Sequence, residues 1–171
     1  MQMSSTGANP INFAGRAANS PQFEALYAEG MSLVEETAAY LDGPGRAASK
    51  HLTPKAAALY SAESIRLTTR LMQLASWLLL QRSLNSGEMT REQVVQERRK
   101  LRLGGGGNED GISAWSELPP GFRDLADHAT RLETRIRKLD ESLMRENAAP
   151  EAANNQVIAQ IDLLQTAFAR R

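Results

Sequence analysis

The chain has 171 residues, which predicts one domain long enough to bury a hydrophobic core. Its 20 basic and 20 acidic residues cancel, so no net field favours nucleic acid or an anionic membrane surface. The absence of cysteine excludes disulfides, thiol catalysis and thiolate metal sites.

The first predicted helix follows a polar amino terminus. Residues 1–19 carry too little apolar surface to offset the entropy of ordering them, so we predict disorder there. The first ten residues have neither a basic start nor an apolar stretch, so we predict no secretory signal. Ser20-Pro21 suits a helix start, and apolar or small residues then recur at three- and four-residue steps as far as Leu41. Gly30 lies on that face, where we expect it to allow close approach of a neighbouring helix. Asp42-Gly-Pro-Gly45 ends the helix.

A second, longer helix is predicted to begin between Arg46 and the capping pair Thr53-Pro54, and to end near Asn85-Ser-Gly87. The run from Leu71 to Leu80 contains only two polar residues, and a helix that is apolar on most sides must be covered on most sides. This run is too short for a bilayer, which needs about 20 residues, so we predict no membrane insertion. The helix therefore lies in a core, covered either by its own chain alone or also by a second subunit.

A shorter, charged helix is predicted next. Thr90 to Gln93 form a capping-box pattern, and the helix is expected to reach about Leu101. Gly104 to Gly111 predict a flexible linker, because glycine and Asn-Glu-Asp-Gly break regular structure.

The last part of the chain combines a heptad helix with a tail. Pro119-Pro120 opens a helix in which apolar residues alternate steps of three and four, as in a packed seam. The seam residues are Phe122, Leu125, Ala129, Leu132, Ile136, Leu139 and Leu143. A second linker is predicted at 147–155, and the tail at 156–171 carries a narrow seam of its own, at Val157, Ile161, Leu164 and Phe168.

These elements predict an all-α fold, an up-down three-helix bundle with a short extra helix. We expect the bundle at residues 20–146, a disordered amino terminus at 1–19, and a linker with an amphipathic tail at 147–171. The tail helix is either mobile or docked, because an amphipathic segment of about 15 residues is marginal as a free helix.

Candidate partner-binding residues lie in the central helix and in the tail. Arg66 and Arg70 are one turn apart, and they either pair locally, as Arg66 can with Glu63, or dock an acidic or phosphorylated partner. Trp77 belongs either to the core or to the centre of a dimer seam. The tail seam suits either its own bundle or the groove of another protein, through Ile161, Leu164 and Phe168.

Other chemistry has weak support. His51 and His128 lack a partner nearby in the sequence, and Glu109-Asp110 lacks the spacing of a calcium loop, so we predict no catalytic residue, metal or cofactor. The basic run Arg98 to Arg102 is the best case for nucleic acid, but acidic and amide neighbours upstream dilute its field. Trp115 lies beside the glycine linker, where it either fastens the linker to the bundle or awaits a partner.

Three segments together resemble the RcdA family, small helical proteins of alphaproteobacteria that regulate CtrA degradation: residues 60–81, residues 33–46 with their Asp42-Gly-Pro-Gly45, and Ser86-Gly-Glu-Met-Thr90. The resemblance covers roughly residues 20–145. It implies a homodimeric three-helix bundle without enzymatic activity, a cytoplasmic protein recruited to the cell pole.

The activity implied by the resemblance is that of an adaptor, which delivers cell-cycle regulators to the ClpXP protease. The implied partners are ClpX with a CpdR-like response regulator, a PopA-like adaptor and CtrA-like cargo. Two alternatives remain open. One is a purely structural homodimer, and the other is a nucleic-acid-binding regulator that would use Arg98, Arg99, Lys100 and Arg102.

Overall fold

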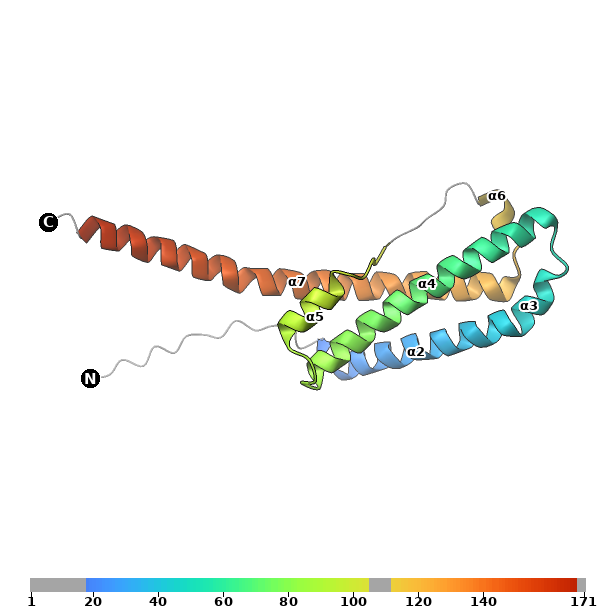
Figure 1. The fold of residues 1–171 in the computed structure, drawn as a ribbon, viewed down its shortest axis with the longest axis horizontal. Coiled ribbons are helices and arrows are strands. Elements are labelled where there is room, and N and C mark those ends of the chain that lie inside the picture. The colour runs from blue at the N-terminus through green and yellow to red at the C-terminus, as the bar shows by residue number, and fades with distance from the viewer. Residues whose placement is uncertain (1–17, 105–111, 169–171) are drawn as a thin grey trace.

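The computed structural model describes the backbone of residues 18–104 and 112–168, and the side chains of residues 18–104 and 114–145. The elements follow in the order α2 (Pro21–Asp42), α3 (Pro44–Ser49), α4 (Pro54–Asn85), α5 (Arg91–Arg98), α6 (Ile112–Trp115) and α7 (Pro120–Phe168). Those residues contain helices and no strand, which confirms the all-α prediction. Helices α2, α4 and α7 pack against one another as the up-down bundle (Figure 1). The short helices α3 and α6 lie at the end where α4 begins, and α5 lies near the other end.

Helices α4 and α5 begin where the sequence places their capping residues. The Thr53 hydroxyl accepts a hydrogen bond from the Ala56 amide at 3.2 Å, and Pro54 is the first residue of α4. At α5, the Thr90 hydroxyl accepts from the Gln93 amide while the Gln93 side chain accepts from the Thr90 amide. These contacts satisfy donors that the first turn of a helix leaves without a partner.

Three shorter elements differ from the prediction, and one of them is α6, a helix that was not predicted. The chain after Asp42 forms the short helix α3, which was not predicted, because Pro44 suits a first helical position and the residues after Gly45 favour helix. Helix α5 ends at Arg98, three residues before the expected end at Leu101. Disorder was predicted at 1–19, of which residues 1–17 lie outside the described residues, while Ala18 is buried and its carbonyl accepts a hydrogen bond from the Asn85 side chain. Most of the predicted glycine linker, 105–111, also lies outside the described residues.

Helix α7 runs through residues 147–155, where the sequence predicts a linker. Four alanines and a glutamate in that segment are strong helix formers, and extending a helix that the bundle has already nucleated is easier than starting one. Pro150 lacks an amide donor and costs about 3 kcal/mol of helix propensity, yet the helix continues past it. The end of α7 consequently extends beyond the other helices (Figure 1). The division of the chain at residue 146 into bundle and tail stays a prediction.

The core lies between α2, α4 and α7. Of the predicted α7 seam, Phe122, Ala129, Leu132 and Ile136 are fully buried. The remaining three, Leu125, Leu139 and Leu143, are half-buried against the same core. Burying one such side chain contributes about 1.5–3 kcal/mol. Gly30 confirms the expected close approach, because a Cβ at that position would clash with Leu78 Cδ1 of α4.

A polar network joins α2 to α7 at the edge of the core. Glu29 of α2 accepts from Arg135 Nη1 at 2.6 Å, and its other oxygen lies 2.9 Å from His128 Nε2. The sequence predicts no partner for His128, because Glu29 is far from it along the chain. Burial raises the pKa of Glu29, but the hydrogen bonds from His128 and Arg135 outweigh burial and hold that pKa below its ordinary value of 4.5.

This network predicts a pH dependence of stability. Because the pKa of Glu29 is lowered in the folded state, its stabilising effect is complete above pH 4.5 and is lost as the pH falls further, through the folded-state pKa. We expect Glu29→Gln to remove up to about 1 kcal/mol at pH 7, a range set by such partly exposed pairs, and progressively less as the pH falls through the folded-state pKa of Glu29. Urea unfolding of both proteins across this range measures the difference. An equal difference at every pH would contradict the assignment.

Candidate partner-binding groove

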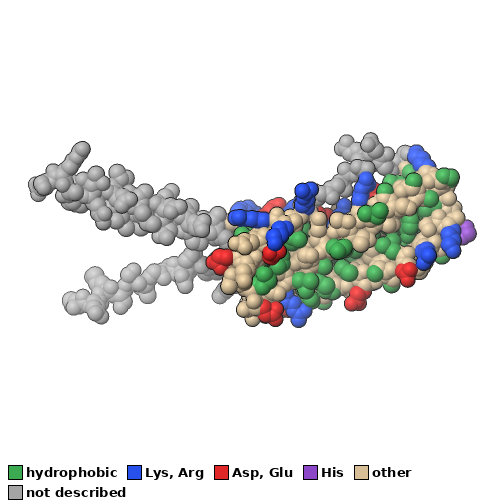
Figure 2. Space-filling model, in the orientation of Figure 1, with side chains coloured by type: hydrophobic (Ala, Val, Ile, Leu, Met, Phe, Trp, Pro, Cys, Tyr) green, Lys and Arg blue, Asp and Glu red, His purple; other side chains and the backbone are tan. Residues whose placement is uncertain are grey.

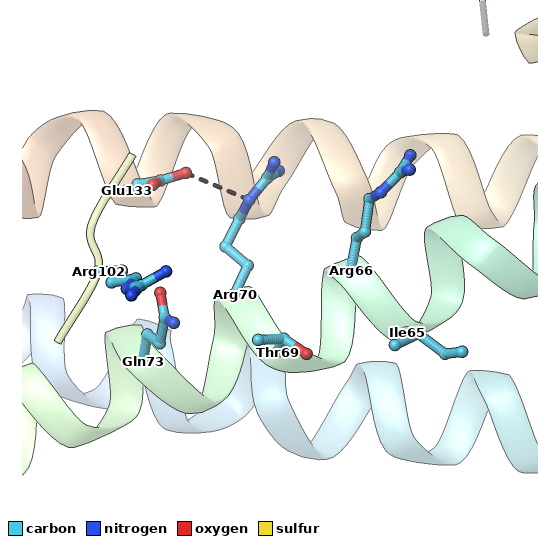
Figure 3. Close-up of a pocket in the computed structure, with 7 residues that line it drawn as sticks. All are labelled: Ile65, Arg66, Thr69, Arg70, Gln73, Arg102 and Glu133. Atoms are coloured by element: carbon cyan, nitrogen blue, oxygen red, sulfur yellow. Dashed lines mark ion pairs between the residues drawn. The ribbon is translucent and has the colours of Figure 1, made fainter. Parts of the chain in front are cut away.

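An open groove lies beside α4, facing α7 and the segment that follows α5 (Figure 3). Its volume is about 350 Å³. Arginine side chains dominate its polar lining, and one glutamate from α7 lies opposite them. The lining residues are Ile65, Arg66, Thr69, Arg70, Gln73, Arg102 and Glu133.

Helix α4 brings Arg66, Arg70 and Gln73 onto one face, because they follow at steps of four and three residues. The Arg66 guanidinium contacts the Glu63 carboxylate, so the local ion pair offered by the sequence is present. The Arg66 side chain nevertheless stays 40% exposed. A guanidinium carries five N–H donors, so the local pair leaves donors for a further acceptor in the groove.

Arg70 ties the central helix to α7. Its Nε lies 3.2 Å from Glu133 Oε2, and its Nη1 donates to Thr130 Oγ1 at 3.0 Å. Glu133 also accepts a hydrogen bond from the Gly104 amide at 2.5 Å, which holds the segment after α5 at the rim of the groove. The contacts of Arg70 with Glu133 and Thr130 could not be predicted from the sequence, because both partners lie far from Arg70 along the chain and no local spacing points to them.

Arg102 adds a third guanidinium from the segment after α5. It is exposed, and no carboxylate of the described residues pairs with it. The three arginines meet two carboxylates, Glu63 and Glu133, so one positive charge is left uncompensated. Guanidinium groups bind carboxylates and phosphates through paired N–H donors. The groove therefore suits an acidic or phosphorylated segment of another molecule.

Trp77 lies away from this groove, inside the bundle. Its side chain is 0% exposed, and its Nε1 donates to Asp140 Oδ1 at 2.8 Å. The guanidinium carbon of Arg98 lies 4.6 Å from the centre of its ring. One chain thus covers Trp77 completely, so it is a core residue and a partner could not reach it without opening the bundle. We do not retain it as a contact residue.

The Arg98–Asp140 pair beside Trp77 was not predicted. Arg98 Nη1 lies 3.3 Å from Asp140 Oδ1, and another nitrogen of the same guanidinium contacts Gln81 Oε1. Burial lowers the pKa of the Arg98 guanidinium, and the Asp140 carboxylate opposes this effect. Arg98 of α5 thus connects α4, through Gln81, with α7, through Asp140. Two features of the sequence could have pointed to these contacts. Gln81 is a polar residue within an apolar helix, and Asp140 is an acidic residue beside the α7 seam.

The basic run at the end of α5 does not form a continuous stripe. Arg98 is buried, Lys100 pairs with Glu97 at 2.6 Å, and Arg102 faces the groove. Binding to a phosphate backbone requires several basic side chains that are exposed together. Arg99, Lys100 and Arg102 are exposed, whereas Arg98 is buried, so the alternative of a nucleic-acid-binding regulator loses one of the four residues that it would use.

The remaining candidates are structural or lie outside the described residues. Trp115 packs edge-on against Phe122, with ring centres 6.3 Å apart, so it fastens the start of α7 to the chain before it. His51 is exposed. Glu109-Asp110 lies outside the described residues, and among those described no group of three potential ligands could hold a metal ion.

The predicted tail contacts fall in the end of α7. The backbone at Ile161, Leu164 and Phe168 is helical, while their side chains lie outside those that the structure describes. Their role in partner binding stays a prediction.

No helix in the described part of the chain is both long and apolar enough to cross a membrane.

Comparison with known proteins relates the chain to a protein family and to a solved structure. A family described as a protein of unknown function, DUF1465, matches residues 14–168. The crystal structure of RcdA from Caulobacter crescentus CB15 is similar with a TM-score of 0.60 and 45% sequence identity, over 76% of this chain and 94% of that one. No curated protein sequence matches significantly.

Proposed function

Because the chain belongs to the RcdA family and matches the DUF1465 family over most of its length, we propose that it is a non-enzymatic adaptor in regulated proteolysis. Its task is to bring CtrA-like cell-cycle regulators to the ClpXP protease. The observation that carries this proposal is the likeness to RcdA, a regulator of CtrA degradation, which extends over nearly all of that protein.

An adaptor of this kind works by tethering. Holding a substrate beside the unfoldase raises its effective concentration and accelerates capture without any bond being made by the adaptor. The bundle must then present separate surfaces to the protease and to the cargo. We assign one of these surfaces to the groove around Arg66, Arg70 and Arg102, and we assign the protein to the cytoplasm as a homodimer.

The groove supports a contact with an acidic partner segment. Arg70 is held in place by Glu133 and Thr130, so part of its ordering cost is met before a partner arrives. The Arg66 side chain is partly exposed and Arg102 is exposed, so a partner carboxylate or phosphate can reach both. The partners in question are ClpX, a CpdR-like response regulator, a PopA-like adaptor and CtrA-like cargo.

Affinity capture tests the proposal. The full chain is immobilised, and lysate of the source cells is passed over it with an ATP-hydrolysis-deficient ClpX that holds its substrates. We expect mass spectrometry to find ClpX, the response regulator and CtrA-like regulators enriched over a bead control. Recovery of the chain alone would overturn the adaptor and favour a purely structural homodimer.

A further inference from the structure

Ile65 is an exposed apolar side chain in the lining of the arginine groove. It is 70% exposed, more than any other large apolar side chain of the described residues. Figure 2 shows hydrophobic side chains recurring along the side of the bundle formed by α2 and α4, with most charged side chains at its margins. At the groove the two kinds meet, because Ile65 and three arginines line it together. Figure 3 shows Ile65 at one end of the groove and Gln73 with Arg102 at the other.

The size of the groove suits an extended segment and not a helix. From Ile65 to Gln73 the distance along the axis of α4 is about 12 Å, at 1.5 Å per residue. One turn of an incoming helix, about 5.4 Å long and about 10 Å across, would fill about 420 Å³, more than the groove's volume of about 350 Å³. An extended segment advances about 3.3 Å per residue, so four steps cover about 13 Å. Because its side chains alternate between two faces, residues four positions apart both face the groove.

The lining between these two ends supplies hydrogen-bonding groups for a peptide backbone. Thr69 is exposed and Gln73 is half-buried, and within residues 18–104 and 114–145 neither side chain has a hydrogen-bond partner. A hydroxyl and an amide can each donate and accept, as the N–H and C=O groups of a peptide require. The groove can therefore satisfy a segment whose backbone is extended and unpaired.

The charge of the groove selects a carboxylate over a phosphate. Arg66 contacts Glu63, and Arg70 pairs with Glu133. Arg102 pairs with no carboxylate in the described part of the chain, so a single positive charge is left over. One carboxylate neutralises that charge. A phosphate group carries a charge of about −1.5 to −2 at pH 7 and would leave the groove with net negative charge.

We propose that the groove binds an extended acidic segment of a partner protein, in which an apolar residue and an aspartate or glutamate stand four positions apart. The apolar side chain packs on Ile65, and the carboxylate binds Arg102. Thr69 and Gln73 bind the backbone between them. Ile65 then determines specificity, because charge alone would accept any acidic segment. This inference rests on the proposed function of the groove and names the kind of segment that it takes.

Fluorescent peptides that are capped at both ends test the segment directly. Their core is Leu-Ser-Gly-Ser-Glu or the reverse order, Glu-Ser-Gly-Ser-Leu, and each is titrated with the full chain in fluorescence anisotropy. Derivatives carry glutamine in place of glutamate, or serine in place of leucine. We expect one of the two orders to bind about fivefold more tightly than each of its derivatives, a factor that one buried methylene or one charged hydrogen bond can supply.

Two single substitutions assign the ends of the groove. Ile65→Ser should abolish the preference for leucine over serine and retain the preference for glutamate over glutamine, whereas Arg102→Gln should do the reverse. Each variant thus contains its own control, because a misfolded chain would lose both preferences. Met72→Ser and Arg99→Gln are the matched variants, since both residues are exposed and lie outside the groove lining, and both preferences should persist in them.

Three results would overturn the inference. One is that neither parent peptide binds at chain concentrations up to about 1 mM. Another is that Ile65→Ser and Met72→Ser affect the preference for leucine equally. The third is tighter binding of a peptide with phosphoserine in place of glutamate, because the groove would then take a phosphorylated segment. None of them bears on the adaptor activity itself, since protease and cargo take no part in the titration.

Discussion

Asp140→Ala is expected to lower the free energy of unfolding by about 3 kcal/mol, the low end for breaking a buried ion pair. The substitution leaves the Arg98 guanidinium, whose side chain is 6% exposed, without its carboxylate. It also removes the acceptor of Trp77 Nε1. The low end applies because the Asp140 side chain is itself 22% exposed, so water can reach part of the site.

Urea unfolding followed by circular dichroism measures this loss. Glu141→Ala is the matched control, since the neighbouring carboxylate is exposed and its contact with Arg137 is 3.9 Å long. We expect the control to change stability by less than about 0.5 kcal/mol. Replacing both partners, as Arg98→Met with Asp140→Leu, should cost far less than Asp140→Ala alone, because no buried charge is left unpaired. Equal effects of Asp140→Ala and Glu141→Ala would contradict the assigned pair.

Reversing two charges of the groove, Arg66→Glu with Arg102→Glu, is expected to weaken binding of an acidic partner at least tenfold. Neither residue connects helices in the described structure, so the fold should be retained, whereas Arg70 holds α4 to α7 and is left unchanged. Each substitution replaces a guanidinium donor with a carboxylate that repels the ligand, and tenfold corresponds to about 1.4 kcal/mol.

Arg91→Glu with Arg99→Glu is the matched control for this experiment. Both residues are exposed beside α5 and outside the groove lining, and the change in net charge is the same. Titration calorimetry with the captured partner at two salt concentrations compares the two variants. An equal loss in both would mean that overall charge, and not the groove, attracts the partner.

The helices were predictable where local chemistry determines them. The Thr53-Pro54 start and the Thr90–Gln93 capping box act within a single turn, so reading the residues was sufficient. The α7 seam was equally clear, because packing on one side repeats every three or four residues. The linker expected at 147–155 was wrong, because the helix continues through Pro150 and the alanines around it.

The candidate site was only half predictable, for a different reason. The Arg66–Glu63 pair is local and was foreseen, whereas the groove requires Arg102 and Glu133, which the tertiary fold brings beside α4. Likewise Arg98, which the sequence offers as the first residue of a basic run, turns inward because Asp140 and Gln81 contact it there. Pairings between distant segments leave no periodic trace in one sequence.

The most direct test of the adaptor is reconstituted proteolysis. Purified ClpXP, the CpdR-like regulator and CtrA-like cargo are combined with increasing amounts of the full chain, and the initial rate of cargo loss is measured. The adaptor account predicts a rate that rises with the chain and then falls at excess, when protease and cargo are bound to separate adaptors. A rate that is independent of the chain, in a reaction that RcdA itself accelerates, would contradict it.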